Sequence, residues 1–135
     1  MPPSYPSIHT YSNMPFHPGD IVSFDFLMPS TGRYLTHSAV VLSCTEVYHH
    51  DSIYVCAMMS SNNVYDRFTF KLDNSMLQST NSRGTSQIRC HLITYVDATK
   101  VHPTQGTPYN RLTKQALKML FSHMNNSTFE LGKTH

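Results

Sequence analysis

The chain has 135 residues, of which 13% are charged, and a net charge of +2 at pH 7 with its nine histidines counted as neutral. This length fits one domain with a single modest core. No apolar run approaches the roughly 18 residues of a membrane span, and the N-terminus lacks the basic and apolar regions of a secretory signal. We therefore expect a cytoplasmic protein with no membrane partner. The mild positive charge permits an RNA partner but does not require one.

The first 15 residues differ in composition from the rest of the chain. They contain four prolines among serine, tyrosine and histidine residues. Proline removes backbone donors and blocks regular elements. We expect residues 1–15 to form an extended, flexible arm and residues 16–135 to form the single domain.

The first two strands are expected directly after this arm. A turn signal, Pro18-Gly19-Asp20, runs into an alternating segment in which Val22, Phe24 and Phe26 point to one side. This pattern predicts a half-buried strand over about 20–27. The β-branched run that follows a polar loop predicts a second strand over about 38–44.

The middle of the chain continues with short strands. Residues 53–59 form an apolar run typical of a buried strand, and residues 67–72 and 86–92 alternate between apolar and polar. We expect residues 46–52 and 73–85 to be loops, and residues 95–97 to end the sheet.

The three cysteines are an odd number without a short paired spacing. Cys56 and Cys90 lie inside the apolar strand segments, whereas Cys44 precedes a polar stretch. A free cysteine behaves as a small apolar residue and is usually buried. We expect Cys56 and Cys90 to be buried and unpaired, as in a reducing compartment.

The C-terminal segment changes to a helical period. Apolar residues recur at steps of three and four between residues 112 and 124, which predicts a helix near 111–124 with Asn110 as its cap. The strands are short and closely connected, so we expect antiparallel pairing. The fold class is therefore mainly β with some α, a strongly curved antiparallel sheet with the C-terminal helix packed on it.

Four segments resemble the MazF/PemK/Kid family of small ribonuclease toxins. In that family Pro-Gly-Asp leads the first strand, and an Ala-Val-Val-Leu-Ser strand like residues 39–43 follows. Residues 55–61 are similar to the family strand that ends Ile-Thr-Ser, and residues 86–97 are similar to the segment with Arg-Cys and a closing Asp. The resemblance implies an SH3-like small barrel with a C-terminal helix. It also implies an endoribonuclease that needs no metal or other cofactor and acts on single-stranded RNA, a homodimer, and possible inhibition by an antitoxin protein.

The site positions of the family are only partly kept in this chain. Arg89 matches the arginine of the Arg-Cys motif, and His91 stands where the family has an acidic residue. His37 replaces an arginine before the second strand, Met59 replaces the threonine of Ile-Thr-Ser, and Thr94 replaces a second arginine. The departures leave open whether the family's catalysis survives.

The residues present still provide a complete set for RNA cleavage. Attack by the ribose 2′-hydroxyl needs a base, an acid for the leaving 5′-oxygen, and a cation for the charged phosphorane. We expect His37 and His91 to be base and acid, because imidazole titrates near neutral pH, and Arg89 to hold the phosphate. The expected substrate-binding residues are Arg33, Ser60, Ser61 and Thr94.

Other interpretations of these residues remain open. His91 and Arg89 face solvent in any alternating strand, and Ser60-Ser61 is typical of a plain turn. The pair His49-His50 next to Asp51 suggests a metal site, but no third spaced ligand accompanies it, and we expect no metal. The alternatives to the ribonuclease are a catalytically inactive member of the fold that binds RNA or protein, and a small structural protein with a superficial resemblance.

Overall fold

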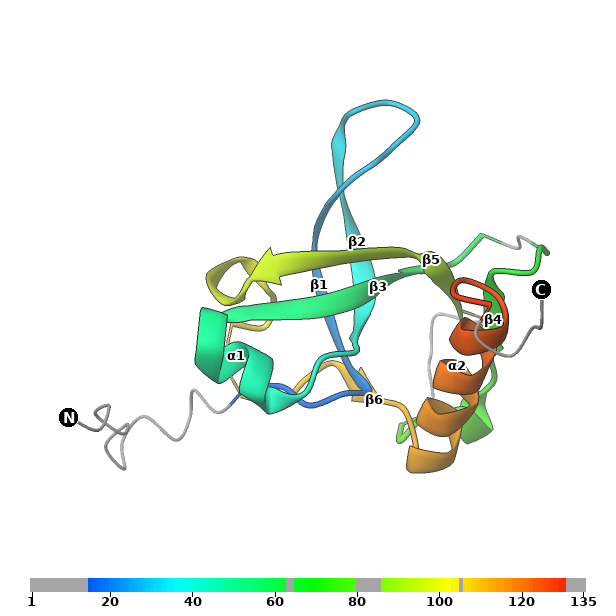
Figure 1. Cartoon of the computed structure of the whole chain (residues 1–135). Coiled ribbons are helices and arrows are strands. Elements are labelled where there is room, and N and C mark those ends of the chain that lie inside the picture. Colours follow the sequence, from blue (N-terminus) through cyan, green and yellow to red (C-terminus); the bar gives the residue numbers. More distant parts are fainter. Residues whose placement is uncertain (1–14, 63–64, 80–85, 105, 131–135) are drawn as a thin grey trace.

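The computed structural model describes residues 15–62, 65–79, 86–104 and 106–130 (Figure 1). The expected arm, residues 1–15, therefore lies outside the described residues apart from Pro15. Pro15 and Phe16 are both buried, and the backbone N–H of Phe16 donates to the Tyr54 hydroxyl at 3.1 Å. The packed part of the chain thus includes Pro15, one residue before the expected start of the domain.

The described chain is mainly β. Its strands and helices, in order, are β1 (Asp20–Leu27), β2 (Tyr34–Val41), α1 (Thr45–Asp51), β3 (Ile53–Ser60), β4 (Thr69–Leu72), β5 (Ser86–Asp97), β6 (Asn110–Arg111) and α2 (Lys114–Asn126). Two short 3-10 turns, Asn74–Met76 and Ala98–Lys100, follow β4 and β5. Among the described helices, none is long and apolar enough to cross a membrane.

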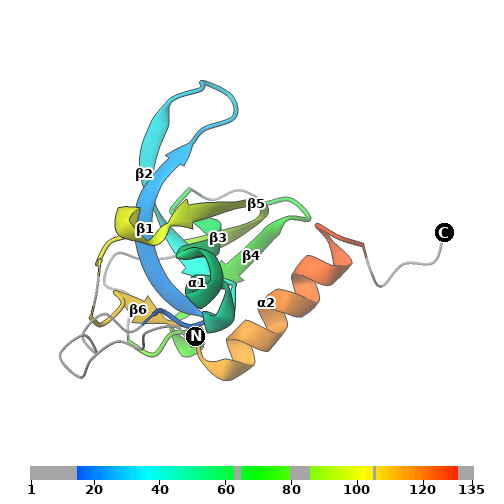
Figure 2. The ribbon, with the colours of Figure 1, turned by 60° about the vertical axis from the view of Figure 1, so that its left-hand side comes forward.

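The strands form one antiparallel sheet of six strands, in the order β4-β5-β3-β2-β1-β6. The prediction of an antiparallel sheet with a C-terminal helix is confirmed. The β1–β2 hairpin extends well beyond the body of the protein, and α1 and α2 lie at opposite ends of the sheet (Figures 1 and 2).

The sheet is not closed into a barrel by strand pairing. The end strands β4 and β6 do not pair with each other in the described residues. The segments that follow them meet instead in an isolated bridge between Leu77 and Leu112, where the Gln78 N–H donates to the Arg111 carbonyl at 2.8 Å. The expected closed small barrel is therefore not confirmed, although these two segments connect the ends of the sheet.

Apolar side chains are buried on both faces of the sheet. One cluster joins Ile21, Val40 and Met59 to the α2 residues Ala116 and Leu120. The second cluster, on the other face, consists of Phe16, Val22, Phe24, Phe26, Ala39, Val41, Tyr54, Cys56, Met58, Val96 and Val101. The alternation of β1 predicted this arrangement, because Val22, Phe24 and Phe26 all belong to the second cluster.

The buried thiols are confirmed. Cys56 and Cys90 are free and fully buried, and Cys44 is free and exposed. Burial raises the pKa of both buried thiols to about 12, because the thiolate would lose its hydration.

Two expectations about helices are wrong. Residues 46–52 were expected to be a loop, but Thr45–Asp51 is a helix that ends at Ser52 in the left-handed conformation. Asn110 does not cap the C-terminal helix, because it belongs to β6. The cap is Thr113, three residues after Asn110. Its side chain accepts from the Ala116 N–H at 3.1 Å, directly before α2 begins.

An ion pair between the buried Asp20 and the partly exposed Arg111, whose side chain is 45% exposed, fixes the beginning of β1 to β6. The Asp20 carboxylate is 3% exposed and accepts from the His17 N–H at 2.9 Å and from Arg111 Nε at 2.9 Å. Removing one partner of a buried pair leaves the other charge uncompensated. We therefore expect Arg111→Ala to lower the free energy of unfolding by about 2–3 kcal/mol in urea titrations.

The control for this variant is Arg33→Ala at the exposed hairpin loop, which should change stability by less than about 0.5 kcal/mol. Equal urea midpoints for the two variants would show that the pair contributes nothing.

Candidate functional site

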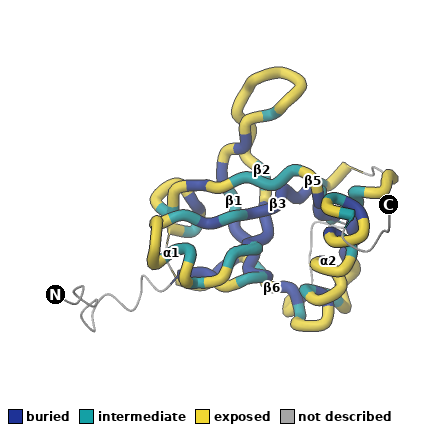
Figure 3. The backbone as a smooth tube through the Cα atoms, viewed as in Figure 1, coloured by how far each residue is buried: buried dark blue, intermediate teal, exposed yellow. Residues whose placement is uncertain are grey.

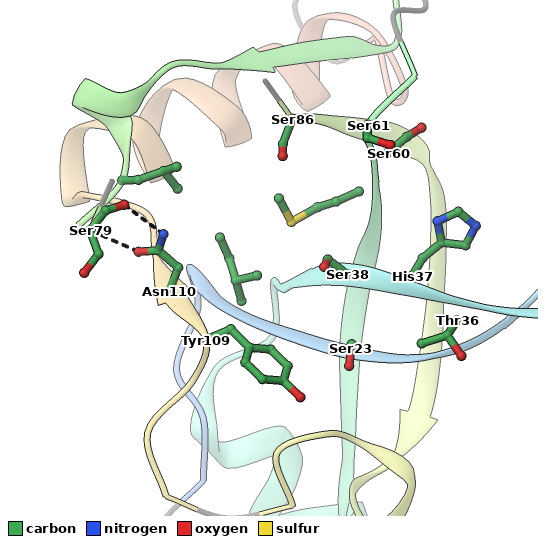
Figure 4. Close-up of a pocket in the computed structure, with 13 residues that line it drawn as sticks. Ser23, Thr36, His37, Ser38, Ser60, Ser61, Ser79, Ser86, Tyr109 and Asn110 are labelled. Carbon is green, nitrogen blue, oxygen red and sulfur yellow. Dashed lines mark hydrogen bonds between the residues drawn. The ribbon is translucent and has the colours of Figure 1, made fainter. Parts of the chain in front are cut away.

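A pocket of about 760 Å³ opens where β2 and β3 separate (Figure 4). The two strands pair only from Ala39–Met58 toward Val41–Cys56, and beyond Ala39 the hairpin leaves the sheet. The pocket is lined by Ile21, Ser23, Thr36, His37, Ser38, Met59, Ser60, Ser61, Leu77, Ser79, Ser86, Tyr109 and Asn110. Seven of these residues are serine or threonine, and no lysine, arginine, aspartate or glutamate is among the lining residues that the structure describes.

One face of the hairpin supplies the polar wall of this pocket. Ser23 pairs with Ser38, and Asp25 pairs with Thr36, so their side chains lie on the same face as Ile21. The Thr36 hydroxyl donates to the Asp25 carboxylate just outside the pocket. Ser23 and Ser38 therefore stand over an apolar floor that is continuous with the α2 side of the core.

His37 and Ser60 border the same opening but belong to the other face. His37 alternates with Thr36 and Ser38, and its ring lies 6.3 Å from that of Phe26 in the second cluster. His37 and Ser60 are each two residues beyond the last β2–β3 pair, Ala39–Met58, at the point where the two strands separate. Figure 4 shows His37, Ser60 and Ser61 together at one rim of the pocket.

From Ser60, a row of paired residues crosses the sheet to its edge at β4. Ser60 pairs with Gln87 of β5, and Gln87 pairs with Lys71 of β4. Gln87 is 4% exposed, and its Oε1 has no hydrogen-bond partner. A buried amide oxygen without a partner costs free energy, which makes this row the least satisfied part of the sheet.

Arg89 lies two residues beyond Gln87 on β5, and its guanidinium pairs with the Asp66 carboxylate. Its Nη1 and Nη2 donate to the two Asp66 carboxylate oxygens at 3.0 and 2.9 Å, and Nη1 also donates to Thr69 Oγ1 at 2.6 Å. Strand alternation puts Arg89 and His37 on the same face of the sheet, opposite to the first cluster, but the Arg89 guanidinium is turned toward Asp66.

His91 lies beside this ion pair. Its ring centroid is 4.7 Å from that of Phe68, and the side chain is exposed at one edge. Partial burial, and then the nearby positive charge of Arg89, lowers the pKa of His91 below its usual value. At neutral pH the neutral imidazole is therefore favoured, which suits a base better than an acid.

The other expected binding residues are separate from this row. The far end of the β1–β2 hairpin is exposed (Figure 3). Arg33 is an exposed residue between these two strands, and its carbonyl accepts from the Met28 N–H at 2.8 Å. Thr94 pairs with Cys56 on the second-cluster face and is half-buried. The structure thus brings His37, Ser60 and Ser61 to one rim, Arg89 and His91 to a second group, and leaves Arg33 and Thr94 apart from both.

Metal-ligating residues do not gather in the described part of the chain. No group of three histidine, cysteine, aspartate or glutamate side chains could hold a metal ion there. His49 and His50 lie in the last turn of α1.

Asp66, Gln87 and Tyr109 are site residues that the sequence did not indicate. Asp66 is 23 residues from Arg89, and only the pairing of β4 with β5 brings the two together. Gln87 was read as one polar residue of an alternating strand, and Tyr109 lies in a segment that carries no motif. The one sequence signal for the Arg89–Asp66 pair was a carboxylate placed just before a strand that could pair with the strand of Arg89.

The Arg89–Asp66 pair should make stability depend on acid pH. Hydrogen bonds from Arg89 hold the pKa of Asp66 well below its usual range. A carboxyl group with a depressed folded-state pKa stabilises the fold above its unfolded pKa, about 3.9, and loses that contribution as the pH falls. We expect wild type to exceed Asp66→Asn in stability at pH 7 and the difference to shrink between about pH 5 and pH 3.

Urea titrations of both proteins at several pH values measure this difference. A difference that stays constant from pH 7 to pH 3 would contradict the role of the ionised carboxylate.

The fold is similar to those of solved toxin structures. One is an endoribonuclease solved in complex with its cognate antitoxin, from a mycobacterial species, with a TM-score of 0.64, 11% identity, and coverage of 90% of this chain and 99% of that chain. Another is the MazE–MazF complex of Deinococcus radiodurans, with a TM-score of 0.61, 15% identity, and coverage of 90% and 99%. MazF alone from the same organism gives a TM-score of 0.62 at 13% identity, with coverage of 87% and 96%.

These similarities define the fold as MazF-like, since the identities are too low to establish more. No curated protein sequence matches the chain significantly. The family model described as the PemK-like, MazF-like toxin of type II toxin-antitoxin systems matches residues 17–125. That match spans most of the chain, and the protein belongs to this family.

Proposed function

We propose that the protein is a metal-independent endoribonuclease that cleaves single-stranded RNA. The single observation that carries this proposal is the meeting of His37 and Ser60 at one rim of a pocket within a toxin-family fold, on the sheet face to which Arg89 belongs. Transesterification at phosphorus requires an acid, a base and a cation, and we assign these roles to His37, His91 and Arg89.

The proposed reaction proceeds without a covalent enzyme intermediate. His91, neutral at pH 7, takes the proton of the ribose 2′-hydroxyl, and the 2′-oxygen attacks the adjacent phosphorus. The bond from phosphorus to the 5′-oxygen breaks, and protonated His37 donates its proton to that oxygen. The products are a 2′,3′-cyclic phosphate and a 5′-hydroxyl end.

Arg89 stabilises the charged phosphorane in this proposal. A phosphate presents two oxygens to the guanidinium in the way that the Asp66 carboxylate does in the free protein. Asp66 is 39% exposed, so an RNA phosphate can replace it on Arg89 from solvent. Ser60 and Ser61 hydrogen-bond to the scissile group beside His37, while Arg33 and Thr94 contact the RNA further along.

The proposal also covers the oligomeric state, the protein partner and the cellular location. We propose a homodimer, because a small domain with low charge can cover surface by pairing symmetrically. The bridge between the segments after β4 and β6 supports an SH3-like barrel. An antitoxin is the expected protein partner, since two of the similar structures are toxin–antitoxin complexes, and we place the pair in the cytoplasm.

One observation favours a second candidate function. The guanidinium of Arg89 is occupied by Asp66 and Thr69, and an arginine held in this way can be purely structural. The alternative is a catalytically inactive member of the family that binds RNA or an antitoxin-like protein through the same surface.

Incubation of the purified full chain with a pool of single-stranded RNA in excess EDTA distinguishes the two functions. The ribonuclease should produce fragments with cyclic phosphate ends. Binding of the same RNA without any fragments would establish the inactive alternative.

A further inference from the structure

Two arginines beside β4, Arg67 and Arg89, are both paired with carboxylates of this chain. Arg89 donates through Nη1 and Nη2 to the two carboxylate oxygens of Asp66 at 3.0 and 2.9 Å. Arg67 Nη2 lies 2.7 Å from Glu130 Oε1. The side chains of the two acids are 39% and 34% exposed, whereas that of Arg89 is 11% exposed. The positive charge that a phosphate would meet here is therefore already balanced within the protein.

Asp66 occupies the edge of the Arg89 guanidinium that suits a phosphate. A carboxylate and a phosphate each present two oxygens to Nη1 and Nη2, so only one of them holds this edge at a time. The turn before β4 directs the carboxylate toward Arg89, because the Phe68 N–H and the Thr69 hydroxyl both donate to Asp66 Oδ1, at 3.0 and 3.1 Å. A phosphate that approaches with this carboxylate in place meets a second negative charge beside the cation.

The position of Arg89 does not depend on Asp66 alone. Thr69 pairs with Arg89 in the β4–β5 register, and its Oγ1 accepts from Nη1 at 2.6 Å. The Cys90 N–H donates to the Phe68 carbonyl at 2.9 Å, which fixes the beginning of β4 to β5. Asp66 precedes β4, and its side chain is exposed to solvent. Rotation of the Asp66 side chain therefore releases the guanidinium while the strand pairing keeps Arg89 in place.

We propose that Asp66 is an intramolecular competitor that blocks Arg89 in the free protein and has to be displaced by a phosphate of the RNA. The inference rests on the proposed ribonuclease function and adds an autoinhibitory contact to it. A ligand that binds only the open form of a site has its apparent affinity reduced by the fraction of molecules that are open. The protein should therefore bind RNA more weakly than the same surface would without this carboxylate.

Binding of an RNA that cannot be cut measures the competition. A 2′-O-methyl RNA pool lacks the 2′-hydroxyl that attacks phosphorus, and fluorescence anisotropy of the labelled pool gives Kd for the full wild-type chain and for Asp66→Asn. The variant keeps the shape of the side chain and removes its charge. It should bind about 10-fold more tightly, because the RNA no longer displaces a charge-assisted contact. Equal or weaker binding by the variant, or no binding by either protein, would overturn the proposal, and weaker binding would make Asp66 a positioning residue for Arg89.

The matched control is Glu130→Gln. This change removes a carboxylate of similar exposure from Arg67 and leaves the Asp66–Arg89 contact intact. Its effect on Kd should be about threefold or less, as is typical of one exposed ion pair. An equal gain in affinity in both variants would show a general effect of charge on this surface and would overturn the competition at Arg89.

A second measurement uses the wild-type chain, since Asp66→Asn is expected to be less stable at pH 7. The side-chain carboxyl carbon of Asp66 can be followed by NMR during titration with the 2′-O-methyl RNA. Its resonance should shift as the carboxylate leaves the guanidinium. A resonance that stays unchanged when the protein is saturated with RNA would overturn the proposal.

Cleavage kinetics separate this inference from the proposed function. If the protein cuts RNA, Asp66→Asn should lower KM by about the factor seen for Kd and leave kcat nearly unchanged, because the displaced contact affects binding and not the chemical step. An unchanged KM would overturn the competition. If neither protein cuts RNA, the proposed function fails, and the comparison of Kd values still decides whether Asp66 competes.

Discussion

Replacing His37 or His91 by alanine should each lower the rate of RNA cleavage by about 100-fold or more. General acid and general base catalysis by a positioned side chain typically contribute that much. Arg89→Ala should cause a loss of similar size, because it removes the only proposed cation from the phosphorane. Initial rates on one labelled single-stranded RNA in EDTA measure all three variants.

The pH dependence of this reaction should be bell-shaped. The rate rises as His91 loses its proton, and the pKa of His91 is lowered, so the acidic limb should lie below the usual imidazole value. A bell requires a general acid as well as a base, and the acidic limb should disappear in His91→Ala but persist in His37→Ala.

His49→Ala and His50→Ala are the controls for these histidine variants. Both residues are exposed on α1, outside the pocket and its rim, and their removal should leave the rate within about twofold of wild type. Unchanged cleavage in His91→Ala would show that the base has been assigned to the wrong residue.

Leu120→Ala should be the most destabilising single change that this fold offers in α2. Leu120 is fully buried between the helix and the sheet, in the cluster that contains Ile21 and Met59. Truncating a buried leucine removes apolar contact and leaves a cavity, at a cost of about 2–5 kcal/mol in the free energy of unfolding. A loss of this size approaches the whole stability of a small domain.

The control for Leu120→Ala is Met119→Ala on the next position of the same helix. Met119 is 42% exposed, and its truncation should cost less than about 1 kcal/mol. Urea unfolding followed by circular dichroism measures both. Similar losses for the two variants would mean that α2 does not pack on the sheet through the face described above.

The site was only partly accessible from the sequence. Alternation placed Arg89 on a strand next to a buried Cys90, and that is confirmed. The expectation that His91 shares the face of Arg89 assumed a regular strand. The β3–β5 register shifts between Ala57 and Met59, so simple alternation does not hold through this part of β5.

The sequence predicted the C-terminal helix but not the residue that caps it. The apolar period predicted α2, but several residues near its start are possible caps, and Asn110 and Thr113 are both good ones. Pairing of Asn110–Arg111 with β1 decides between them, because a residue in a strand cannot also cap the helix. Thr45–Asp51 was missed because seven residues are too few to show a helical period.

The sequence by itself determined the approximate positions of β1, β3, β4 and β5, their antiparallel pairing, the buried cysteines and the C-terminal helix. Those features depend on periodicity and turn residues, which are local properties of the chain. Only the tertiary structure decided the order of the strands, the earlier start of β2 at Tyr34, the contact of Asp66 with Arg89, and the pocket that His37, Ser60 and Tyr109 line. Each of these depends on which strand lies next to which and in what register, and contacts between residues 23 to 90 positions apart leave no periodic signal in the sequence.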